Sequence, residues 1–130
     1  MSLKLGTWKI CLSGNNGELK ITEVKGDGEF NGTLLIQGIG GAYAESPVVG
    51  IYNETSRAIC FHLSRGAYSG SPLIFNGILF SDPSRPNPGQ DIIWRISGTM
   101  DCSLVEFATN LGGNAKRRTF GWIAEIHEEL

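Results

Sequence analysis

The sequence lacks the features that mark several large classes of protein. No apolar run approaches the roughly 20 residues that a membrane-spanning helix needs. Basic residues are not in excess, since 11 Lys and Arg stand against 13 Asp and Glu and the formal net charge is −2. The one basic cluster, Lys116-Arg117-Arg118, is too small to predict a nucleic-acid surface. We therefore expect neither a membrane nor a nucleic acid as a partner.

Cysteine is also scarce. Cys11, Cys60 and Cys102 are an odd set without C-x-x-C spacing, so at most one disulfide can form within the chain, and free cysteines are the simpler interpretation. Cys60 and His62 would share one face of a strand, but two ligands do not make a zinc site and the spacing suggests no third. No metal and no cofactor are expected. No Ser-His-Asp or Cys-His arrangement has local support, so the chain is not expected to be an enzyme.

Helical periodicity is almost absent from the 130 residues, which are enough for one domain with a buried core. Hydrophobic residues make up 41% and charged residues 18%, as in globular proteins rather than disordered ones. The 18 glycines have no collagen period and therefore indicate many turns. No secretory signal segment is visible, so the residues themselves leave the compartment open.

The pattern that recurs is a short apolar or alternating run followed by a turn signal, which is typical of an all-β protein. It predicts eight strands, at residues 6–12, 18–24, 29–37, 48–53, 57–64, 72–80, 91–98 and 117–126. Residues 100–115 read as a long link that is partly helical near 103–108. Most links are short, which favours antiparallel neighbours in an up-and-down, eight-stranded β-barrel that leaves no edge unpaired and has room for one small ligand.

The third predicted strand is the reference for the rest of the chain. Asp27-Gly28 supplies a turn, because Asp and Gly tolerate the backbone angles of a hairpin. Phe30 and the run Thr33 to Ile36 suit a pleated surface. Gly32 interrupts the strand, and a glycine there predicts a bend or the close approach of another backbone, which suits a closed barrel.

Short motifs in this order resemble the avidin and streptavidin family. They are Gly6-Thr7-Trp8, Gly28-Glu29-Phe30-x-Gly32-Thr33, Glu45-Ser46-Pro47-x-x-Gly50, Phe75-x-Gly77 and Trp94. The resemblance runs from about Gly6 to about Trp94. It implies that residues 1–130 form a single avidin-like barrel domain that binds biotin in its open end, assembles into homo-dimers or homo-tetramers, and is secreted or periplasmic.

The chain departs from the family at three polar positions of the ligand wall. The resemblance places Ile10 where the family has an asparagine, Leu34 where it has a tyrosine and Ile36 where it has a threonine. Methyl groups cannot hydrogen-bond a ureido group, and each unmatched polar atom costs about 1 to 3 kcal/mol. Biotin binding is therefore predicted to be weak or absent, and another small, more apolar ligand is an alternative.

Other family positions are kept. The resemblance assigns Trp94 and Phe75 as aromatic ligand walls, with Ile96 beside Trp94, and matches one aromatic and two serines in the loop before the sixth strand: Tyr68, Ser69 and Ser71. The candidate ligand-binding residues are these six with Ile10, Leu34 and Ile36. Trp94 is as readily core as ligand wall, and for the three aliphatic residues filling of the lumen is favoured.

An outer face is predicted beside the sixth strand. If Phe75, Gly77 and Leu79 point inward, then Ile74, Ile78 and Phe80 point outward, joined by Ile93 from the next strand. An apolar outer patch indicates a partner subunit, so self-association through strands five to eight is expected. The leading hypothesis is a non-enzymatic ligand-binding barrel. The alternative is a structural or assembly module with a filled lumen that acts through its oligomeric surface.

Overall fold

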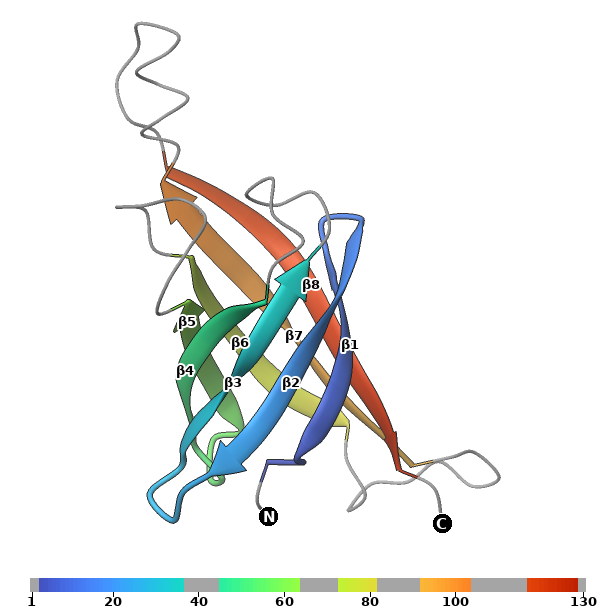
Figure 1. The fold of residues 1–130 in the computed structure, drawn as a ribbon, viewed down its shortest axis with the longest axis vertical. Coiled ribbons are helices and arrows are strands. Elements are labelled where there is room, and N and C mark those ends of the chain that lie inside the picture. The colour runs from blue at the N-terminus through green and yellow to red at the C-terminus, as the bar shows by residue number, and fades with distance from the viewer. Residues whose placement is uncertain (1–2, 37–44, 64–72, 82–91, 104–116, 129–130) are drawn as a thin grey trace, which may run out of the picture.

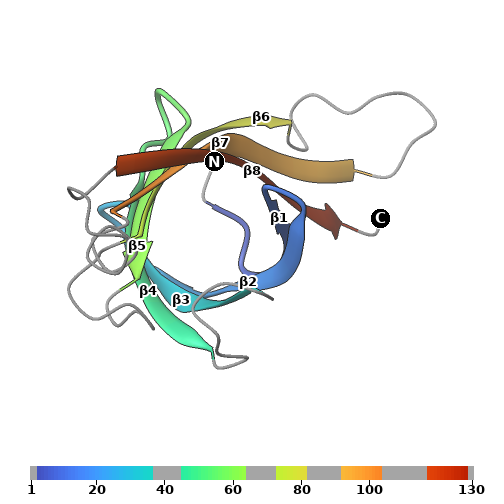
Figure 2. The ribbon, with the colours of Figure 1, turned by 90° about the horizontal axis from the view of Figure 1, so that it is seen from above.

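The structure is a computed structural model that describes residues 3–36, 45–63, 73–81, 92–103 and 117–128. Eight strands form one closed antiparallel barrel in chain order. They are β1 (Gly6–Leu12), β2 (Asn15–Val24), β3 (Glu29–Ile36), β4 (Ser46–Tyr52), β5 (Ala58–Leu63), β6 (Ile74–Ser81), β7 (Ile92–Ser103) and β8 (Arg117–Glu128). Figures 1 and 2 show them crossing obliquely round a single lumen. The predicted all-β, eight-stranded, up-and-down antiparallel barrel is confirmed.

Closure of the barrel depends on the pairing of its first and last strands. Ile10 lies opposite Ala124 and Leu12 lies opposite Trp122, so β8 completes the sheet against β1. No strand of a closed barrel has a free edge, which removes the row of unpaired N–H and C=O groups that an open sheet would present. The strands β1, β3, β5 and β7 all run toward the same end of the barrel, which we call the Ile36 end. The opposite end is called the Tyr52 end.

Alternation of side chains places the core inside the barrel. In β3, Phe30, Leu34 and Ile36 are buried, while Asn31, Thr33 and Leu35 are half-buried. This is the period of two that a strand with one buried face requires. Gly32 lies in the same buried row, and a Cβ there would collide with the backbone carbonyl of Lys20 on β2. The predicted close approach of another backbone at Gly32 is therefore confirmed.

Two tight turns rest on residues with positive φ. Ser13 and Gly14 have φ of 48° and 89° and join β1 to β2. Positive φ at both central residues is typical of the two-residue hairpin turn that matches strand twist. Gly28, with φ of 93°, closes the turn into β3, where its N–H donates to the carbonyl of Lys25 at 3.0 Å.

Several predicted boundaries were wrong. β2 begins at Asn15, three residues earlier than expected, because Asn15 and Asn16 pair with Leu12 and Cys11 instead of forming the turn. β7 does not end at Gly98 but continues to Ser103, because its residues pair with β8 as far as Arg117. The predicted link therefore starts later, and the helical stretch expected near residues 103–108 lies outside the described residues beyond Ser103. None of the described residues forms a helix that is long and apolar enough to cross a membrane.

The outer wall has two unlike halves. On β1 to β3, charged side chains alternate with the buried ones: Lys9, Glu18, Lys20, Glu23 and Glu29. The Lys20 ammonium lies 2.8 Å from a carboxylate oxygen of Glu45, and this hydrogen bond raises the pKa of Lys20. On β5 to β8, two rows of neighbours cross the sheet without a charge: Ala58, Ile78, Ser97 and Ile123, then Cys60, Asn76, Thr99 and Gly121.

Glycine at position 32 is required by the sheet rather than by a turn. Gly32→Ala should lower the free energy of unfolding by about 1–3 kcal/mol, because the added methyl forces apart β2 and β3. Gly121→Ala is the matched control, since a Cβ at Gly121 meets nothing within 4 Å. Urea denaturation followed by circular dichroism compares the two. Equal effects of the two substitutions would contradict the close approach at Gly32.

Candidate functional site

The candidate site is the lumen, because six of the nine predicted ligand residues point into it. Ile10, Leu34 and Ile36 are 2%, 4% and 6% exposed, and Phe75, Trp94 and Ile96 are equally enclosed. They come from β1, β3, β6 and β7, which the barrel brings together around one axis. The three aliphatic residues therefore face the interior, as the sequence predicts. Whether any of the six contacts a ligand stays a prediction.

The remaining three predicted ligand residues, Tyr68, Ser69 and Ser71, lie outside the described residues. The site can therefore be built only from the strands.

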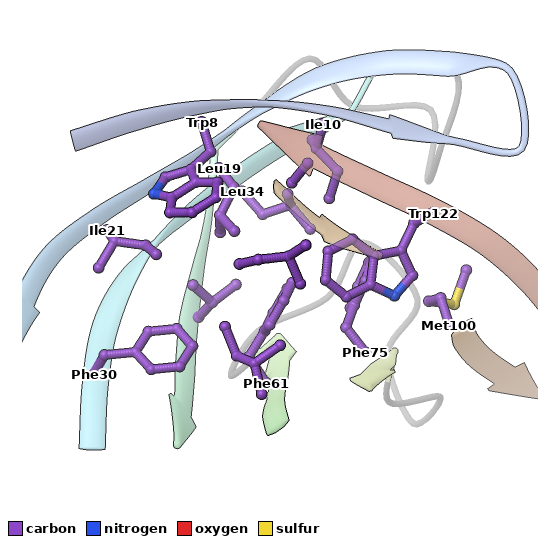
Figure 3. Packing of buried hydrophobic residues seen from close by; sticks show 14 of the residues in the cluster. Trp8, Ile10, Leu19, Ile21, Phe30, Leu34, Phe61, Phe75, Met100 and Trp122 are labelled. Atoms are coloured by element: carbon purple, nitrogen blue, oxygen red, sulfur yellow. The ribbon is translucent and has the colours of Figure 1, made fainter. Parts of the chain in front are cut away.

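Aromatic rings pack inside the barrel in two groups, and Figure 3 shows Trp8 and the rings of the second group. In one, Trp8 and Trp94 meet edge to face with ring centroids 6.4 Å apart. The other contains Phe30, Phe61, Phe75 and Trp122: the rings of Phe61 and Phe75 stack at 4.6 Å, and Trp122 stands edge-on to both. Each such pair contributes about 0.5–1.5 kcal/mol beyond the area that it buries. The rings thus hold one another as a packed core.

The exposed fractions show how tightly this region is packed. Phe30, Phe61, Phe75, Trp8 and Ile96 are each 0% exposed. A void wide enough for water beside one of these side chains would give it accessible area, so no such void touches them. An empty pocket of several hundred Å³, as small-molecule sites have, does not border these five residues.

Polar groups inside the lumen are few and are used by the protein itself. The indole Nε1–H of Trp8 donates to the carbonyl of Lys4 at 3.0 Å, and that of Trp122 donates to the carbonyl of Thr99 at 3.0 Å. The other fully enclosed side chains in the described part of the chain are hydrocarbon, apart from the thioether of Met100, the indole of Trp94 and the phenol of Tyr52. A guest could therefore make van der Waals and aromatic contacts with this wall, but few hydrogen bonds.

The structure shows how the inward aromatic residues are grouped. Trp94 packs with Trp8, whereas Phe75 packs with Phe61 and Trp122. Whether Trp94 and Phe75 contact one ligand stays a prediction. Phe61 was not singled out at all. Its signal was the alternation of Ile59 and Phe61 in β5, which places both side chains on the inner face.

A separate pocket of about 310 Å³ lies at the Tyr52 end, between the β2–β3 and β4–β5 turns. None of the predicted ligand residues lines it. Its polar groups serve the turns: the Asp27 carboxylate accepts from the backbone N–H of Glu29, and the Asn53 side-chain oxygen accepts from those of Thr55 and Ser56. Within the described ranges, no three His, Cys, Asp or Glu side chains gather to hold a metal ion.

Comparison with known proteins places the barrel among avidins by its fold. No protein-family model matches the sequence, and no curated protein matches it either. The structure is similar to the crystal structure of xenavidin, with a TM-score of 0.57 and 22% identity over 91% of this chain and 93% of that one. It is similar to apo shwanavidin, with a TM-score of 0.59 and 16% identity over 95% and 98%, and to a low-affinity mutant of shwanavidin. This chain has an avidin-like fold.

Two phenylalanines of β6 test the packed lumen. Phe75→Ala should lower the free energy of unfolding by about 3–5 kcal/mol, because it leaves a cavity between the rings of Phe61 and Trp122. Phe80→Ala, on the same strand but 48% exposed, should change it by less than about 0.5 kcal/mol. Thermal and denaturant unfolding measure both. A small effect at Phe75 would mean that its ring borders an open space.

Proposed function

We propose that this protein is a non-enzymatic, avidin-like binding barrel whose ligand is a small apolar molecule held at the Ile36 end of the lumen. The observation that supports it is the wall itself: Ile10, Leu34 and Ile36 turn hydrocarbon toward the axis. Apolar ligand sites are lined in this way, with a small number of polar groups that fix orientation. Ile96, Trp94 and Phe75 belong to the same interior.

The same wall argues against biotin. The bicyclic ring of biotin carries a ureido carbonyl and two N–H groups, which lose their hydrogen bonds to water on entering the lumen. At about 1–3 kcal/mol for each unmatched group, three missing partners lower affinity by about two to six orders of magnitude. Biotin binding is therefore weak or absent in this proposal.

The same chemistry supports the proposal that the protein is not an enzyme. An acid–base site needs a positioned titratable group within reach of its substrate. In the part of the barrel that the structure describes, Tyr52 is the single titratable side chain among the buried residues. Its hydroxyl group belongs to the Tyr52 end, away from the proposed ligand. The barrel therefore works by binding.

Isothermal titration tests the proposal directly. Biotin added to the protein should give no saturable heat, or a dissociation constant in the micromolar range or weaker, with an avidin as the positive control. The reason is the loss of hydrogen-bonding partners at positions 10, 34 and 36. A nanomolar dissociation constant for biotin would contradict the proposal. A panel of small apolar ligands should instead raise the melting temperature.

A second candidate is an assembly module with a filled lumen. Two observations favour it: the aromatic rings that close the interior, and the uncharged outer face of β5–β8, where Ile78 and Phe80 are 56% and 48% exposed. Both residues point outward as the sequence predicts, Ile74 is half-buried beside them, and the side chain of Ile93 lies outside the described ones. An exposed apolar patch of this kind indicates a partner surface, and the partner proposed here is a second copy, in a homo-dimer or homo-tetramer.

The border of this face suits self-association. The ion pair of Arg95 with Glu125, at 3.4 Å, lies along one side of the two uncharged rows. Asp101, which accepts a hydrogen bond from the Thr119 hydroxyl at 2.6 Å, lies along the other. An apolar centre with a charged rim is the usual anatomy of a protein interface.

One surface substitution tests the assembly. Ile78→Lys should weaken self-association about tenfold or more, because it buries an ammonium at the centre of the face. Thr7→Lys on the exposed wall of β1 is the control and should leave assembly unchanged. Sedimentation velocity across a concentration series reports the subunit number. A wild-type chain that stays monomeric at high concentration would exclude this candidate.

A further inference from the structure

The indole of Trp122 is one of the buried aromatic rings that fill the lumen. It projects from β8 toward β5 and β6 (Figure 3). Its ring centroid lies 5.6 Å from that of Phe61 at an interplanar angle of 73°, and 5.8 Å from that of Phe75 at 74°. The hydrogen bond from Nε1 to the carbonyl of Thr99 fixes the ring in its plane. The indole is thus held by contacts of the kind that a bound aromatic molecule would make.

Gly77 makes room for this ring, and a second glycine, Gly98, lies between the two strands that carry Gly77 and Trp122. In the inward row, Gly77 of β6 pairs with Gly98 of β7, which pairs with Trp122 of β8. A Cβ on Gly77 would lie 2.8 Å from Cζ2 and 3.1 Å from Cη2 of the indole. At Gly98, a Cβ would collide with the backbone of Asn76. The barrel therefore carries one large side chain where its two neighbours have none.

This exchange of volume has a consequence for binding. Core packing leaves little empty space, so the volume released by the missing side chain of Gly77 must be filled. Here the indole of Trp122 fills this volume. It stands edge-on to the rings of Phe61 and Phe75. Without that ring the space would be lined by Phe61 and Phe75, whose apolar rings are well suited to a flat guest.

We infer that Trp122 is the specificity-determining residue of the lumen, and that its indole occupies the space where an aromatic guest would otherwise lie. The inference deepens the proposed function and rests on it in one respect, because it treats the lumen as the binding space. In the wild-type barrel Trp122 excludes planar molecules of indole size from the space beside Phe61 and Phe75. Removal of the ring converts that space into a site for such molecules.

The test is the gain of a binding site. Trp122→Ala should bind added indole with an affinity about tenfold or more above that of the wild type, since an apolar cavity of about 150 Å³ stays dry and takes up benzene-like molecules. Titration by isothermal calorimetry measures the affinity, and a crystal structure with indole should place the guest ring where the indole of Trp122 lay, against the stacked rings of Phe61 and Phe75. Phe80→Ala, which removes an exposed ring, is the matched control and should gain no binding.

A second variant covers the case in which Trp122→Ala does not fold. Trp122→Leu keeps part of the volume and should take up benzene, measured as a rise in melting temperature with benzene concentration. A folded variant that binds neither probe, or whose phenylalanines have closed the space, overturns the inference. Failure of both variants to fold also overturns it, because the indole would then be required by the fold itself.

The inference and the proposed function can fail separately. If the wild type binds no apolar ligand while Trp122→Ala binds indole, the role of Trp122 stands and the proposed function falls. If the wild type binds an apolar ligand and neither Trp122 variant gains a site, the proposed function stands and the inference falls.

Discussion

Volume inside a closed ring of eight strands is the constraint on which the rest of this structure depends. The strands fix the width of the barrel, and every second residue must fill it, because a packed interior leaves little space. The solution found here pairs large rings with absent side chains: Trp122 lies beside Gly77 and Gly98. Gly32 solves a related problem, since the carbonyl of Lys20 passes where its side chain would be.

The same constraint shapes what the lumen can do. A wall of isoleucines, leucines and aromatic rings gains its stability from burial, at about 25 cal/mol for each Å² of apolar surface. Polar groups on that wall would cost free energy unless a guest or the protein satisfied them. The tryptophan N–H groups of Trp8 and Trp122 are satisfied by backbone carbonyls, so they make no demand for a guest. Stability of the empty barrel and affinity for a polar ligand therefore oppose each other.

Outside the barrel, the two halves of the wall differ for a separate reason. Outward residues carry no packing requirement in a monomer, and β1 to β3 use them for charges such as Lys20 and Glu29. The outward residues of β5, β6 and β8 include Ile78, Phe80 and Ile123, which water does not favour. These exposed apolar side chains have no packing role within the monomer. They are therefore the physical basis for the proposed partner surface on β5 to β8.

Much of the fold could be predicted from the sequence, because period-two alternation is a local signal. The bounds of β1 and the buried rows of β3 and β6 follow from it, as does the outward placement of Ile78 and Phe80. The end of β7 could not be predicted from the sequence. Gly98 looks locally like the end of a strand, and β7 continues beyond it only because its residues pair with β8. The grouping of Trp94 with Trp8, and of Phe75 with Phe61, was equally out of reach.

The sequence by itself determined that alternate side chains of each strand share a face, because alternation depends only on neighbours along the chain. Its resemblance to the avidin family assigned Ile10, Leu34 and Ile36 to the inner wall, where they are buried. Only the tertiary structure decided how that interior is shared. Register between strands and the slant of the barrel determine which inward residues meet, and these depend on contacts between residues far apart in sequence. Trp122 comes to lie against Phe61 and Phe75 for that reason, and whether the lumen holds a guest or its own ring is decided there.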